Sequence, residues 1–380
     1  MSFATLALIS AVALLGPLLA LPRAWHLPIL LGELIAGVAL GHTGVGVLHA
    51  DDAGFTSLAN IGFALIMFVA GSHVPVRDLR LRQALRNGAG RAAAVVALAV
   101  PLALAVAALA QTHHPALYAV LLASSSAALV LPIVDSLGLT GTAVLELQAQ
   151  VAIADAACVV ALPLVIDPGE AARAALGAAA VIAAAAALYL GLSRLERSGL
   201  RRRVHRLSEK RKFALELRIN LIALFTLGAL ATATHVSIML AGFCLGLVFA
   251  AVGQPRRLAR QVFALTEGFL GPVFFVWLGA SLDVHALAQR PALILLGAAL
   301  GIGAIAVHAA MRVTGQPLPL AVLAAGQLGV PIAAATIGTQ RNLLVPGEAA
   351  ALVLGALITI AAAIAAQAAH THPPAPTPAH

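Results

Sequence analysis

Long apolar blocks alternate with short polar stretches along all 380 residues. Blocks of about 17–25 apolar residues are long enough to cross a bilayer as α-helices. A membrane β-barrel would instead alternate apolar and polar residues, and this chain does not. The pattern therefore predicts an all-α polytopic membrane protein. Its thirteen predicted spans are 3–21, 28–46, 57–73, 92–110, 116–134, 143–166, 173–193, 214–234, 237–252, 262–281, 291–310, 318–338 and 347–367.

Composition supports this class. The chain is 61% hydrophobic and 10% charged, whereas about a quarter of the residues in soluble domains are charged. Cys158 and Cys244 both fall inside apolar blocks, and we interpret them as small buried residues rather than a disulfide or a metal pair. No cofactor is predicted, and the Pro-rich tail 368–380 is expected to be disordered.

The basic residues predict the orientation. Most of them gather in "VRDLRLRQALRNGAGR" (76–91), "SRLERSGLRRRVHRLSEKRK" (193–212) and "QPRRLAR" (254–260). If the spans alternate in direction, these stretches share one side, and the positive-inside rule makes it cytoplasmic. The N-terminus is then outside and the C-terminus inside. Because the stretches act as topology signals, no nucleic-acid partner is predicted.

The span order also allows an internal repeat. Spans two to six and nine to thirteen form two sets of five, and the first helix of each set enters the membrane from the opposite side. Inverted five-helix repeats are typical of transporters, whose substrate site lies near the bilayer midplane between interrupted helices.

One acid lies near the middle of an apolar span. Asp155 stands within "QAQVAIADAACVVALPLVI" (148–166), which contains no Lys, Arg or His. A charge at this depth costs about 2.5–3.5 kcal/mol, and such acids usually mark ion or proton paths. An apolar setting favours the protonated form, while the ionised form is a hard oxygen ligand for a cation. Asp155 is therefore predicted to bind H+ or a cation in turn. The alternative is a neutral carboxyl group that is hydrogen-bonded inside the bundle.

Spans five and twelve carry the features of interrupted helices. "ASSSAALVLPIV" (123–134) combines serines with a proline, and "AAGQLGVPIAAA" (324–335) combines glycines with Gln and Pro. Hydroxyls can ligate a cation, although serines also hydrogen-bond within their own helix. Gly and Pro within one turn favour a broken helix. The candidate ion ligands are Asp155, Ser126, Ser125 and Ser124, and the candidate helix-break residues are Gln327, Gly329, Pro331 and Pro132.

Several segments carry a family resemblance in their order and spacing. They are "LPILLGELIAGVALG" (27–41), "GFALIMFVAGSHVPVRDLR" (62–80), "VSIMLAGFCLGLVFA" (236–250) and "GFLGPVFFVWLGASLDVHAL" (268–287). Together they resemble the second family of bacterial monovalent cation:proton antiporters. That family includes Na+/H+ antiporters and potassium-efflux systems.

The resemblance implies a transporter rather than an enzyme. It implies H+ exchange for Na+ or K+ by an elevator-like movement, in a homodimer of the bacterial inner membrane. It matches Asp155 to the family's ion-binding aspartate and Ser126 to the hydroxyl residue of the crossing helix. The implied organisation is scaffold helices in 1–91, core helices in 92–166, a linker helix and basic loop in 167–213, scaffold helices in 214–290, core helices in 291–367 and the tail 368–380.

The sequence also departs from that family's pattern. Ala154 stands where Asp, Asn or Gln usually precedes the aspartate, Ala127 replaces an acid found in one branch, and span twelve contains no Lys or Arg. With Asp155 as the single titrating group, one H+ should exchange for one cation without net charge movement. Two alternatives remain open, a sodium-coupled organic-anion carrier of related fold and a degenerate, non-transporting relative.

Overall fold

The computed structural model describes residues 2–21, 29–74, 76, 79–198, 215–234, 236–253 and 256–371. Its described part contains helices and turns and no strand. Most of the basic stretch 193–212 and residues 372–380 of the predicted tail lie outside the described residues. Residues 368–371 of that tail are helical rather than disordered, because the helix Glu348–Thr371 continues through them. The chain divides into two compact units.

The membrane class is confirmed by the helices themselves. Ten helical segments in the described part are long and apolar enough to cross a bilayer. Three shorter apolar helices, Phe3–Leu19, Ile29–Leu40 and Ile238–Val252, coincide with the first, second and ninth predicted spans. The total of thirteen spans therefore stays a prediction. The ten segments are 53–72, 84–110, 115–134, 142–166, 168–197, 215–233, 258–281, 291–314, 318–340 and 348–366.

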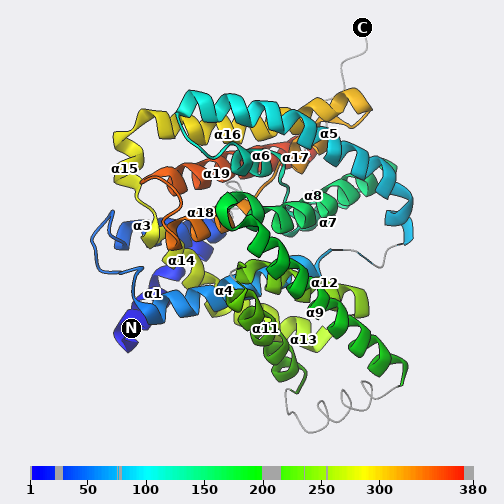
Figure 1. Cartoon of the computed structure of the whole chain (residues 1–380), viewed down its shortest axis with the longest axis horizontal. Coiled ribbons are helices and arrows are strands. Elements are labelled where there is room, and N and C mark those ends of the chain that lie inside the picture. The colour runs from blue at the N-terminus through cyan, green and yellow to red at the C-terminus, as the bar shows by residue number, and fades with distance from the viewer. Residues whose placement is uncertain are drawn as a thin grey trace. The chain divides into compact units, whose positions relative to one another are not determined.

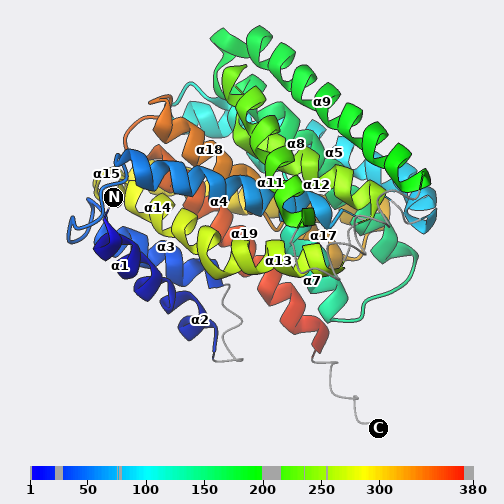
Figure 2. The same ribbon diagram turned by 90° about the horizontal axis from the view of Figure 1, so that it is seen from below.

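The first unit comprises Met1–Arg77, Pro163–Gln289 and Thr336–Ala349. In both ribbon views the long α9 runs beside α11 and α12 (Figures 1 and 2). Close packing of α4 on α12 depends on Gly71, because a Cβ at that position would collide with the carbonyl oxygen of Phe243. Its helices are α1 (Phe3–Ala13), α2 (Leu15–Ala20), α3 (Ile29–Leu40), α4 (Ala53–Ser72), η1 (Pro168–Glu170), α9 (Ala171–Arg197), α11 (Leu215–Ala233), α12 (Ile238–Val252), α13 (Arg256–Leu265), η2 (Thr266–Leu270), α14 (Gly271–Ser281) and α15 (Val284–Gln289).

The second unit comprises Asp78–Leu162, Arg290–Ala335 and Ala350–His380. Within it, α16 packs against α5, α6 and α17 (Figure 1). Two of its apolar segments are each split into a pair of short helices. Its helices are α5 (Leu79–Ala110), α6 (Pro115–Ala123), α7 (Ala127–Ser136), α8 (Thr142–Ile166), α16 (Pro291–Ala309), η3 (Ala310–Thr314), α17 (Leu318–Ala324), α18 (Gly329–Gln340) and α19 (Glu348–Thr371), of which α8, α18 and α19 extend into the first unit.

Some boundaries differ from those expected from hydropathy. The basic stretch 76–91 is helical from Leu79 onward, so most of it belongs to α5 rather than to a loop. Leu, Arg, Gln and Ala are strong helix formers, and a long basic side chain can reach water from a helix near the membrane surface. The predicted span 262–281 is likewise not uniform, because the π-helical turn η2 separates α13 from α14.

Candidate functional site

The first interruption lies in the segment that carries three consecutive serines. Helix α6 ends at Ala123 and α7 begins at Ala127, so Ser124, Ser125 and Ser126 bridge a non-helical gap. All three are buried. Ser124 Oγ donates to the carbonyl of Leu121 in its own helix at 2.9 Å.

The second interruption lies between Ala324, which ends α17, and Gly329, which begins α18. The two gaps contact each other directly. The backbone N–H of Ser126 donates to the carbonyl of Gly326 at 2.9 Å, and Ser125 Oγ donates to the carbonyl of Ala324. Each gap therefore satisfies backbone groups that the other leaves without a helical partner, as buried polar groups require.

Gln327 holds the second gap from two sides. Its side-chain Nε2 donates to the carbonyl of Leu121 at 2.7 Å. Its backbone N–H donates to Oγ1 of Thr359 in α19 at 3.2 Å. Both side chains are buried. An amide and a hydroxyl thus replace the hydrogen bonds that a continuous helix would make here.

The prolines occupy different positions in the two segments. Pro331 lies in the first turn of α18, which begins at Gly329, where a backbone N–H would have no partner within the helix. Pro132 lies inside α7 and lacks the N–H that would bond to the carbonyl of Ala128. Gly329 and Pro331 therefore suit the start of a helix, and Pro132 frees a carbonyl beyond the gap.

Asp155 faces the first interruption from α8. Its side chain is buried, with 4% exposure, and its Oδ2 accepts a hydrogen bond from the backbone N–H of Ala127 at 2.8 Å. Because Ala127 is the first residue of α7, the carboxylate lies at the positive end of that helix. A carboxylate has about four lone-pair positions, so this single bond leaves several for a proton or a cation.

The electrostatics favour an exchangeable ligand. Within the described ranges, neither Lys nor Arg forms an ion pair with Asp155. An amide dipole only partly offsets the free energy of burying a full charge. A bound H+ or monovalent cation would neutralise the carboxylate, and the two would compete for the same oxygen atoms.

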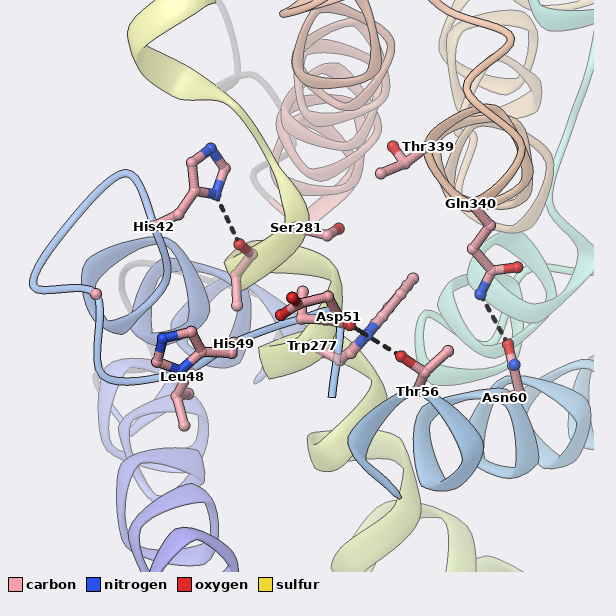
Figure 3. A pocket seen from close by; sticks show the side chains of 13 residues that line it. His42, Leu48, His49, Asp51, Thr56, Asn60, Trp277, Ser281, Thr339 and Gln340 are labelled. Carbon is pink, nitrogen blue, oxygen red and sulfur yellow. Dashed lines mark hydrogen bonds between the residues drawn. The ribbon is translucent and has the colours of Figure 1, made fainter. Parts of the chain in front are cut away.

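A separate cavity of about 770 Å³ lies wholly within the first unit. The loop between α3 and α4, the N-terminal part of α4 and the ends of α14 and α18 line it, and Figure 3 shows His42, His49 and Asp51 around it. Trp277 Nε1 donates to the carbonyl of Ala50 at 2.9 Å. None of the predicted site residues lines this cavity, and the described residues contain no cluster of His, Cys, Asp and Glu suited to a metal.

Comparison with known proteins now assigns the family. The transmembrane sodium/hydrogen exchanger profile matches residues 10–368. The chain belongs to this exchanger family. The family consists of transporters, and its assignment confirms the expected relationship to monovalent cation:proton antiporters.

Individual relatives agree with the assignment. The chain is 23% identical over 382 residues to the Bacillus subtilis protein named "Putative Na(+)/H(+) antiporter YjbQ", covering 94% of this chain and 61% of that one. It is 43% identical over 54 residues to Na(+)/H(+) antiporter NhaS5 of Synechocystis, which is 14% of this chain and 8% of that protein. The chain thus spans less than two thirds of the length of either relative.

A solved structure confirms the fold. The sodium proton antiporter MjNhaP1 from Methanocaldococcus jannaschii superposes with a TM-score of 0.64 and 14% identity, covering 95% of each chain. A sequence identity of 14% supports a shared fold and nothing more specific. The roles of individual residues in this chain stay predictions.

Sequence reasoning missed two partners in the site. Thr359 is buried and accepts from the backbone of Gln327; its signal was a single hydroxyl in the otherwise apolar stretch 351–366. The second partner is the backbone amide of Ala127, which meets Asp155. No side chain in the sequence indicates this partner, because the donor is a main-chain N–H.

Proposed function

We propose that this exchanger couples the movement of H+ to that of a monovalent cation, Na+ or K+, with Asp155 binding each in turn. The observation that carries the proposal is the buried Asp155 carboxylate against the first amide of α7, beside two interrupted helices. Family membership supports the same activity.

The expected cation ligands are oxygen atoms around the first gap. Asp155 supplies the carboxylate, and Ser126 immediately precedes the amide that holds it. Carbonyl and hydroxyl oxygens keep a free lone pair after one hydrogen bond, so Ser124 and Ser125 can still contribute. Hard cations prefer such oxygen ligands. Since H+ and the cation use the same carboxylate, binding of one excludes the other, and this exclusion couples the two fluxes.

The transport movement is proposed from the family resemblance and from the hydrogen bonds of the second unit. Asp155 and both gaps belong to that unit and are bonded to one another. This arrangement supports an elevator-like movement of the site as one body, with the first unit as the scaffold of a homodimer. The proposed location is a bacterial inner membrane, with the N-terminus outside and the C-terminus inside.

Purified protein in proteoliposomes tests this function. The vesicles contain a pH-sensitive dye, and a gradient of Na+ or K+ is imposed at zero membrane potential. The expected result is a cation-dependent pH change inside the vesicles. Sodium uptake that requires an organic anion would instead indicate the related carrier activity. Absence of flux with Na+, Li+ and K+ at correct insertion would contradict the exchange function.

A further inference from the structure

Helix α8 carries polar residues on the side that faces away from Asp155. Glu146 lies nine residues before Asp155, which turns it by about 180° around the helix axis, and about 13 Å along it. Gln150 follows Glu146 by four residues and shares its face. Both side chains are buried, with exposures of 8% and 1%. The two faces of one helix thus have separate polar environments.

Glu146 is held by two side chains of α5. Arg91 Nη1 lies 2.8 Å from Glu146 Oε2, and Asn87 Nδ2 donates to Glu146 Oε1 at 2.6 Å. Arg91 Nε also donates to Oγ1 of Thr314, the last residue of η3, at 3.1 Å. The contact of Arg91 Nη1 with Glu146 is an ion pair, while the bonds from Asn87 to the carboxylate and from Arg91 Nε to Thr314 are charge-assisted hydrogen bonds, which are stronger than bonds between neutral groups. They restrain both the position and the rotation of α8.

Gln150 makes the next contact along the same face. Its Oε1 accepts from Nε2 of Gln316 at 3.0 Å, and both residues are 1% exposed. Gln316 lies two residues before Leu318, where α17 begins. This bond therefore ties α8 to the start of the helix that ends at the second interruption.

These contacts close a circuit of hydrogen bonds. Gln150 joins α8 to the start of α17, and the end of α17 at Ala324 accepts from Ser125 in the first gap. The gap leads into α7 at Ala127, whose amide returns to Asp155 on α8. A rotation of α8 that breaks its contacts on one face would also move the carboxylate on the other.

We propose that Glu146, held by Arg91 and Asn87, is a positioning residue that sets the rotation of α8 and so holds the Asp155 carboxylate against the amide of Ala127. Gln150 and Gln316 complete this restraint. Groups that orient a metal ligand from outside the site typically change affinity by about 10–100-fold when they are removed. The inference rests on the proposed exchange function for its effect on transport, but not for its effect on structure.

The test begins with Glu146→Gln, which keeps the shape and removes the charge. We expect the Na+ concentration for half-maximal exchange to rise by about tenfold, with protein of normal size-exclusion behaviour. The matched control is Glu170→Gln, which removes the same charge from an exposed pair with Arg173 at 2.7 Å. Exposed pairs contribute little, so the control should behave like the wild type.

A second variant separates positioning from stability. Arg91→Met combined with Glu146→Leu replaces the buried pair by apolar side chains, a change that proteins often tolerate without losing stability. If the pair serves stability alone, this folded double variant keeps the wild-type half-saturating Na+ concentration, and the proposal is overturned. If the pair positions Asp155, the double variant shows the same rise as Glu146→Gln.

Hydrogen–deuterium exchange provides a readout that needs no transport. Release of the Asp155 carboxylate should remove protection from the amide of Ala127 in both variants, while Glu170→Gln leaves it protected. Unchanged protection in folded variants would refute the positioning role. If the wild type itself moves no cation, the exchange function fails, and the protection of Ala127 still decides the role of Glu146.

Discussion

Helix α8 carries two buried carboxylates with opposite surroundings. Glu146 is paired with Arg91 at 2.8 Å and accepts from Asn87 at 2.6 Å. Asp155 accepts from the backbone amide of Ala127 at 2.8 Å. One carboxylate is thus neutralised by a fixed cation of the protein, and the other is held by a dipole.

The difference shows how one helix can combine a structural and an exchanging acid. Removing one partner of a buried ion pair lowers the free energy of unfolding by about 3–5 kcal/mol, because the other charge is left unbalanced. Arg91 already balances the charge of Glu146, so this acid needs no mobile ligand. A backbone amide at a helix start contributes about 0.3–2 kcal/mol toward a nearby negative charge, which leaves much of the desolvation cost of Asp155 in place. A proton or a cation can remove that cost, and either can leave again.

The largest effect is expected from Asp155→Asn, which removes the acid that no side chain in the described part of the protein neutralises. The Asn side chain keeps its size and still offers an oxygen to the amide of Ala127, but it cannot take up a proton or balance a cation. We expect exchange to fall to the level of empty proteoliposomes while the thermal unfolding profile stays close to that of the wild type. Wild-type exchange rates at equal reconstitution would show that another group carries the ions.

A smaller effect is expected from Thr359→Val, which removes a hydroxyl from the second interruption at constant shape. The buried N–H of Gln327 then lacks its acceptor, at a cost of about 1–3 kcal/mol in the free energy of unfolding. We expect a lower midpoint of thermal unfolding and slower exchange. The control is Thr232→Val, because Thr232 Oγ1 donates to carbonyls of its own helix, α11. An equal loss in both variants would argue against a special role for Thr359.

Membrane voltage should leave the balance point of exchange unchanged. When Asp155 alone titrates in the site, H+ and a monovalent cation each neutralise it, and no net charge crosses. A second transported charge would add about 2.3 kcal/mol per 100 mV. We therefore measure the Na+ gradient that balances a fixed pH gradient at several clamped potentials.

A balance point that moves with voltage would show a second proton carrier. A balance point that stays constant supports Asp155 as the single exchanging acid.

The smallest effect is expected from Asp167→Asn. Asp167 follows the last residue of α8 and is only partly buried, and its backbone carbonyl accepts from the N–H of Glu170 in the turn that follows. Surface substitutions of this kind usually change the free energy of unfolding by less than about 0.5 kcal/mol. Exchange rates and half-saturating Na+ should match the wild type. A clear loss of exchange in Asp167→Asn would mean that an acid outside the buried part of α8 also contributes, contrary to the role that we infer for Asp155.

Local sequence patterns indicated the membrane class of this chain and its candidate site. A bilayer requires long apolar helices, so block length indicated the polytopic fold. The same solvent makes an acid in an apolar span costly, which singled out Asp155. Serines, glycines and prolines inside spans five and twelve indicated interrupted helices, and α6–α7 and α17–α18 are split there. Each of these signals is local, because it depends on composition within one span.

Which of these groups contact one another depends on the tertiary packing. Ser125 bonds to Ala324 across 199 positions, and Gln327 reaches the carbonyl of Leu121 across 206. The donor to Asp155 is a backbone amide, and an amide is present at nearly every residue, so no sequence pattern marks the one that points at a carboxylate. The pairing of Arg91 with Glu146 likewise arises from packing of α5 on α8. Hydrophobicity places residues in the membrane, but only close packing selects their partners.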